Sequence, residues 1–112
     1  MEINANQALL NLSEIASEAH AKIQQDFKDI NPVIGVVQAM RRAGIPADAM
    51  TIDCLQSKKR ILIILHDQHP DIMQYQFMML NQDPGDEYQR INSKEVSVDT
   101  IYDWIQSYFS AQ

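Results

Sequence analysis

Two histidines and two aspartates lie within six residues of one another in the middle of the chain, at His66, Asp67, His69 and Asp71. Imidazole and carboxylate groups are the ligand types that zinc and other first-row metals take in proteins. A metal site needs three or four ligands that converge, and here all four candidates come from one connecting segment. The remaining histidine, His20, lies far away in the sequence, in a predicted helix.

A turn between two strands is the alternative interpretation of the same segment. In that case Asp67 and Asp71 cap backbone amides and Pro70 fixes the bend. We expect the turn, and we expect no cofactor. A small metal-dependent hydrolase that uses the segment from His66 to Asp71 is kept as the alternative function.

No nucleophile with its supporting residues is visible in the sequence. Cys54 is the single cysteine, so it cannot form an internal disulfide, and it alternates with Ile52 along a predicted strand. That position is typical of a small buried apolar residue. The chain has no Gly-x-Ser-x-Gly motif and no glycine-rich phosphate loop. We name no catalytic residues, and the sequence favours a protein that is not an enzyme without deciding the question.

Basic residues gather in two short groups, although the chain of 112 residues carries a formal net charge of −6. The candidate anion-binding residues are Arg41, Arg42, Lys58, Lys59 and Arg60. If the two groups meet in space, they form a positive patch suited to an acidic partner or a phosphate group. The structural alternative is that the arginines complement a helix dipole and the second group keeps a strand edge from pairing. An acidic chain lacks the footprint of general nucleic-acid binding, so no nucleic-acid partner is expected.

The elements that position these groups begin with a buried strand over residues 60–66, whose apolar run from Ile61 to Leu65 is too short for a lone helix. Residues 72–80 alternate as in a half-buried strand. Residues 50–55 predict another strand, and residues 87–91 are a candidate fourth after the Pro84-Gly85 turn. These segments predict an antiparallel meander of three to four strands.

Helices are predicted before and after these strands along the sequence. Apolar spacings of three and four indicate a long amphipathic helix over residues 5–28. Asn31 and Pro32 are a favoured N-cap and first helical residue, so a second helix is expected from there to Gly44. A final helix is expected after its N-cap at Ser97.

The predicted fold class is therefore α+β. Two N-terminal helices precede the antiparallel sheet, and a C-terminal helix packs on it. We expect a single domain over residues 1–112.

The predicted sheet carries apolar side chains on both faces. One face packs on the helices, while the other presents the candidate partner-binding residues Leu62, Ile64, Met78 and Leu80. Helices on both faces, a loop folded over the sheet, or a partner could cover this second face. The binding partner is expected to be another protein or a second copy of the chain, since two-fold dimers dominate among oligomers.

The expected function is thus that of a small acidic interaction module, an adaptor or chaperone-like protein that forms a homodimer. In size, acidity and order of elements the chain is similar to the small acidic chaperones of bacterial secretion systems, without a shared motif. The N-terminus lacks a basic signal region and no apolar stretch reaches the length of a membrane span. We expect a cytoplasmic protein without a membrane partner.

Overall fold

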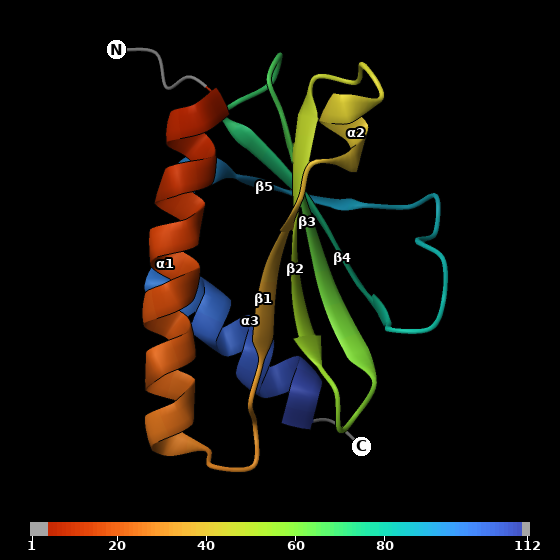
Figure 1. Cartoon of the computed structure of the whole chain (residues 1–112). Helices are drawn as coiled ribbons and strands as arrows, with labels where there is room; N and C mark the ends of the chain where they lie inside the picture. Colours follow the sequence, from red (N-terminus) through yellow and green to blue (C-terminus); the bar gives the residue numbers. More distant parts are fainter. Residues whose placement is uncertain (1–4, 111–112) are drawn as a thin grey trace.

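The computed structural model describes residues 5–110, which form one α+β unit with a five-stranded antiparallel sheet (Figure 1). The strands are β1 (Val33–Val37), β2 (Ala47–Cys54), β3 (Lys59–His66), β4 (Ile72–Met79) and β5 (Gln89–Asn92). The helices are α1 (Ala5–Asp26), α2 (Ala39–Arg42) and α3 (Val98–Ser110), with a 3-10 turn, η1 (Ser93–Glu95), before α3.

The strands lie side by side in the order in which they occur along the chain, from β1 to β5. The meander predicted from the sequence is confirmed, but the sheet has five strands instead of three or four. β2 and β3 occupy its centre. α1 and α3 cover one face, and the short α2 lies on the opposite side (Figure 1).

The predicted second N-terminal helix is wrong for most of its length. Residues Val33–Val37 form strand β1, and only Ala39–Arg42 are helical. Four of the five β1 residues are β-branched, which favours an extended backbone, and the strand gains a hydrogen-bonded partner in β2. This tertiary pairing outweighs the local start signal of Asn31 and Pro32.

The predicted stop at Gly44 is nevertheless correct for α2. Gly44 has a φ of 91°, in the left-handed region that glycine adopts without steric cost. Its N–H donates to the C=O of Arg41, and the N–H of Ile45 donates to the C=O of Met40 at 2.8 Å. These two bonds form a Schellman motif, which turns the chain from α2 into β2.

The main core lies between the sheet and the two long helices. α1 contributes Leu12 and Ile23, and α3 contributes Ile101 and Ile105, all with no exposed surface. Cys54 is buried in this core, as its alternation with Ile52 predicts. Ser97 caps α3 by accepting a bond from the N–H of Thr100, which also agrees with the sequence.

The sequence leaves two registers open for the β2–β3 hairpin, with Cys54 opposite Ile63 after a two-residue turn or opposite Leu62 after a three-residue loop. Cys54 pairs with Lys59, so residues 55–58 form a four-residue loop, and Lys58 adopts a φ of 58°. The observed loop is longer than either of these predictions. The observed shift relative to Ile63 is even, so every side chain keeps the face that the Ile63 register predicts.

Candidate functional site

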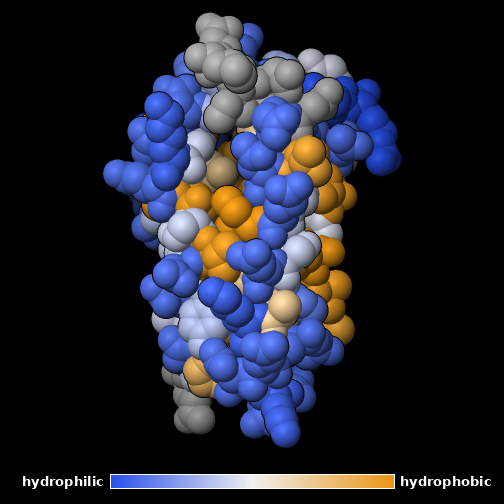
Figure 2. Space-filling view, turned by 90° about the vertical axis from the view of Figure 1, so that its left-hand side faces the viewer, coloured by the Kyte–Doolittle hydropathy of each residue, from blue (hydrophilic) through white to orange (hydrophobic). Residues whose placement is uncertain are grey.

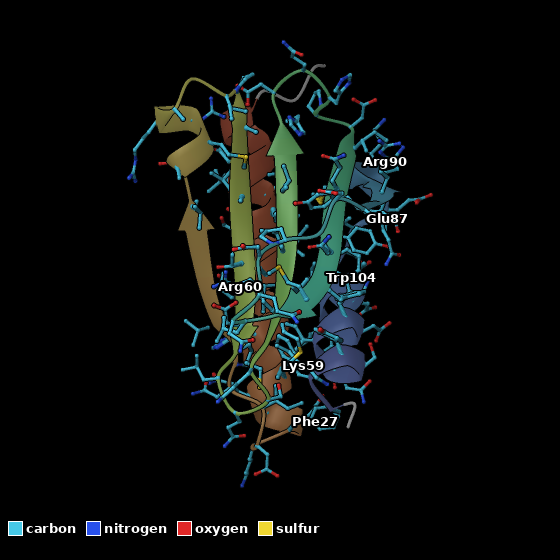
Figure 3. The ribbon with its side chains drawn as sticks, turned by 90° about the vertical axis from the view of Figure 1, so that its right-hand side faces the viewer. Phe27, Lys59, Arg60, Glu87, Arg90 and Trp104 are labelled. Carbon is cyan, nitrogen blue, oxygen red and sulfur yellow. The ribbon has the colours of Figure 1, made fainter. Side chains whose placement is uncertain are left out.

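The second face of the sheet is covered in large part by the chain itself. Leu62 and Met78 are 8% exposed, and with Ala49 they form a small core that Met40 and Tyr88 cover. Met40 comes from α2, and Tyr88 from the loop between β4 and β5. Figure 3 shows this loop, in which Glu87 is labelled, passing in front of the central strands.

A single side chain in β4 fastens that loop to the sheet. The amide nitrogen of Gln76 donates to the C=O of Gly85 and of Glu87, at 3.2 and 2.8 Å. Its amide oxygen accepts from the N–H of Gly85 at 3.0 Å. The loop therefore folds over the sheet, which was one of the alternatives left open by the sequence.

The four candidate partner-binding residues lie along this covered face and just beyond it. Leu62 and Met78 are buried beneath the loop, whereas Ile64 and Leu80 are half-buried. The four residues together do not form an exposed apolar patch. A partner could reach Leu62 and Met78 only after the loop has moved.

The candidate anion-binding residues lie at opposite ends of the sheet. Arg41 and Arg42 are in α2, and Lys58, Lys59 and Arg60 lie at the β2–β3 turn, at the other end of β2 (Figure 1). They do not form one positive patch.

Arg41 is engaged by two carboxylates at once. Its guanidinium donates two hydrogen bonds to Asp48 at 2.9 Å, and two more to Asp67 at 2.7 and 2.9 Å. The side chain of Asp48 is 2% exposed, so the ion pair neutralises a buried charge. The hydrogen bonds from Arg41, more than its charge alone, lower the pKa of Asp67, and the same carboxylates raise the pKa of Arg41.

The second basic group is also tied to neighbouring residues. Arg60 donates to both oxygens of Asp53, its cross-strand partner, at 2.7 and 2.9 Å. Lys59 donates to the C=O of Tyr108 and lies 5.0 Å from the centre of that residue's ring. These contacts join β3 to α3 and to β2, and because β3 is a central strand they do not serve to protect a sheet edge.

The segment from His66 to Asp71 forms a turn between β3 and β4. Within residues 5–110 no three histidine, cysteine, aspartate or glutamate side chains are grouped so that they could hold a metal ion. Asp67 is directed to Arg41, and the C=O of Asp71 accepts from the N–H of Ser93. His66 and His69 line a shallow hollow with Arg90, a cation that disfavours metal binding there.

The surface that the sequence interpretation missed is strand β1. Val33, Val36 and Val37 are 49, 45 and 41% exposed, which is unusual for a β-strand made entirely of apolar residues and glycine. In Figure 3 β1 is the outermost strand at the left, and no other described strand or helix lies along its outer side. Figure 2 shows hydrophobic atoms along the right-hand margin of the molecule, the side on which β1 lies.

The ladder pattern indicates which backbone groups of β1 are unpaired. The N–H of Asp67 donates to the C=O of Pro46, two register steps beyond the pair of Asp48 and Leu65. Bonded and non-bonded pairs alternate in an antiparallel ladder, so the even-numbered residues of β2 bond to β3 and the odd-numbered residues face β1. The bond from the N–H of Leu80 to the C=O of Lys58 gives the same phase.

This phase leaves two residues of β1 directed outward. Val33, Gly35 and Val37 stand opposite the odd-numbered residues of β2 and bond to them. The N–H and C=O groups of Ile34 and Val36 therefore face the open side of the strand. No other hydrogen bond within the described part of the chain engages these groups.

The opposite edge of the sheet is protected. β5 is four residues long, and its sequence Gln-Arg-Ile-Asn is mostly polar. Arg90 is exposed and projects from this edge (Figure 3). Charge is a usual means by which proteins keep an edge strand from pairing, and β1 has neither a charge nor a bulge.

No protein-family model matches the chain, and no curated protein or solved structure matches it. Among the helices of residues 5–110, none has the length and apolar content needed to cross a membrane.

Proposed function

We propose that this protein is a non-enzymatic interaction module, which binds another polypeptide as an added strand along the edge of β1. The single observation that supports this function most strongly is the contrast between the two edges of the sheet. β5 is polar and carries a charge, whereas β1 is apolar and uncharged. An unprotected edge invites pairing with a further strand, so its presence beside a protected one favours use of the edge in binding.

The chemistry of β1 selects an extended apolar segment as the ligand. The outward N–H and C=O groups of Ile34 and Val36 offer two donors and two acceptors at strand spacing, which only an extended backbone matches along its length. Val33 and Val37 project on one face of the strand and Val36 on the other. Apolar side chains of an added strand would cover these valines, and their burial would supply the driving force.

Binding of a peptide tests this function directly. The probe is a capped peptide with the sequence of residues 31–38, added to isotope-labelled protein and followed by amide chemical shifts. The matched control carries N-methyl groups at the positions of Ile34 and Val36, which removes its edge donors. We expect shifts confined to β1, β2 and their immediate surroundings, with the control peptide at least tenfold weaker. No shifts, or shifts centred on another surface, would contradict the proposal.

The alternative function, a metal-dependent hydrolase, has a separate test. Protein purified without added metal is analysed for zinc and manganese, and His66→Ala and His69→Ala variants are compared with it. Stoichiometric metal that both substitutions remove would favour the enzyme. The ion pair of Asp67 with Arg41 supports the opposite result, because it occupies one of the four candidate ligands.

A further inference from the structure

We infer that the strand which pairs with β1 is the β1 of a second copy of this chain, antiparallel to the first across a two-fold axis at Gly35. This inference rests on the proposed function and specifies its partner. The resulting dimer has a continuous ten-stranded sheet. Its two β1 edges pair with each other at the centre, and its two polar β5 edges form the outer edges.

The phase of the hydrogen bonds makes β1 self-complementary in this register. With Gly35 on the axis, Ile34 faces Val36 of the second copy and Val36 faces Ile34. Both residues direct their N–H and C=O groups outward, so these two pairs form four hydrogen bonds. An axis at Ile34 or Val36 would pair part of β1 with residues outside the strand, whereas the Gly35 register pairs all five residues.

The side chains also fit this arrangement. The two Gly35 residues form a non-bonded pair, in which the Cα atoms are about 4.5 Å apart and opposing side chains are closest. Glycine leaves room at that point. Val33 then lies opposite Val37 of the second copy on one face, and both valines are more than 40% exposed in the single chain.

The absence of charge along β1 favours pairing with a second copy of the strand. Residues 31–38 contain no charged side chain, so self-pairing brings no like charges face to face at the new ladder. The whole body carries −6, which opposes association at longer range and is screened by salt. A short paired edge with this repulsion predicts a reversible dimer instead of an obligate one.

The test is the solution mass from about 1 to about 500 μM, where reversible contacts of this size dissociate and associate. We expect the mass to rise from 12.8 kDa toward twice that value. Val36→Pro removes an outward N–H without touching the β2 ladder and should hold the mass at 12.8 kDa at every concentration. Val36→Thr keeps the N–H and the side-chain shape, and should dimerise within about threefold of the parent.

A second pair of variants covers the case in which V36P does not fold. Val37→Lys places a cation on the edge and should abolish the dimer, while Leu55→Lys places the same charge at a 62% exposed leucine in the β2–β3 loop and should not. A dimer that survives in both V36P and V37K would overturn the inference. A parent chain that stays monomeric but binds the 31–38 peptide would overturn self-pairing alone; one that does neither would overturn the proposed function as well.

Discussion

Gln76 binds the backbone of Gly85 with both ends of its side-chain amide, donating to the C=O at 3.2 Å and accepting from the N–H at 3.0 Å. The amide thereby replaces a strand partner for this loop residue. This contact distinguishes the two candidate binding surfaces. It holds the loop over the second face of the sheet, whereas nothing comparable covers the outer side of β1 in the described residues. The interaction that we propose therefore uses an edge of the sheet and not its face.

Removal of this fastening should expose the second face. Gln76→Ala loses three hydrogen bonds, and we expect the free energy of unfolding to fall by about 1–2 kcal/mol, since each such bond contributes modestly at a half-exposed site. Loop residues 81–88 should exchange their amide hydrogens faster, and a hydrophobic dye should bind near Leu62 and Met78. Gln74→Ala, on the same face of β4, is the matched control; equal dye binding by both variants would contradict this role of Gln76.

Loss of Arg41 should destabilise the fold through the buried carboxylate that it neutralises. In Arg41→Gln, the Asp48 carboxyl stays at 2% exposure and loses the cation that it binds, and we expect the melting temperature to fall by on the order of 10 °C. Arg42→Gln makes the same change of charge at the exposed neighbouring residue, and it should shift the melting temperature by less than about 2 °C. Thermal unfolding by circular dichroism measures both, and equal shifts would contradict the structural role of Arg41.

Acid should weaken the protein partly through Asp67. Its pKa is lowered in the folded state by the hydrogen bonds from Arg41. The folded chain therefore binds fewer protons at this carboxylate than the unfolded chain does. The resulting stabilisation is complete well above the unfolded-state pKa of about 4 and is lost as the pH falls through the lower folded pKa. Asp67→Asn should therefore flatten the dependence of stability on pH below about pH 5. Parallel profiles for the parent and D67N would contradict this assignment.

Salt should strengthen the self-association. Two bodies of charge −6 repel one another, while the β1 contact itself is uncharged. Raising the salt concentration from about 0.05 to about 0.5 M screens the repulsion, and we expect the dimer Kd to fall about threefold or more. Sedimentation at both salt concentrations measures the change. A dimer that salt dissociates would be held by ion pairs and not by β1.

The central part of the fold could be predicted from the sequence because its signals are local. The apolar run from Ile61 to Leu65 and the alternation that follows indicate β3 and β4, and the Gly44 stop is correct to the residue. The local signals around strand β1 conflict with one another. Asn31 and Pro32 are equally good before a helix or an extended segment, and the partner that decides between them, β2, lies more than ten residues away.

Some features of the candidate site likewise have a local signal in the sequence, whereas others depend on long-range contacts. Residues 33–37 are β-branched except at Gly35, a composition typical of a strand, and this signal could have identified β1. The pairing of Arg41 with both Asp48 and Asp67 depends on long-range register and has no signature in the sequence. The same holds for the loop over Leu62 and Met78, since no local pattern says where residues 81–88 fold back.

Amide hydrogen exchange at Ile34 and Val36 tests the role of the β1 edge most directly. At low protein concentration their N–H groups face water and should exchange fast, while Gly35 and Val37 are bonded to β2 and stay protected. At high concentration, protection should appear at Ile34 and Val36 alone among the β1 amides, and it should be absent at the same concentration in V37K, which is expected to stay monomeric. Exchange at these two amides that stays fast at every concentration and in the presence of the 31–38 peptide would contradict the account.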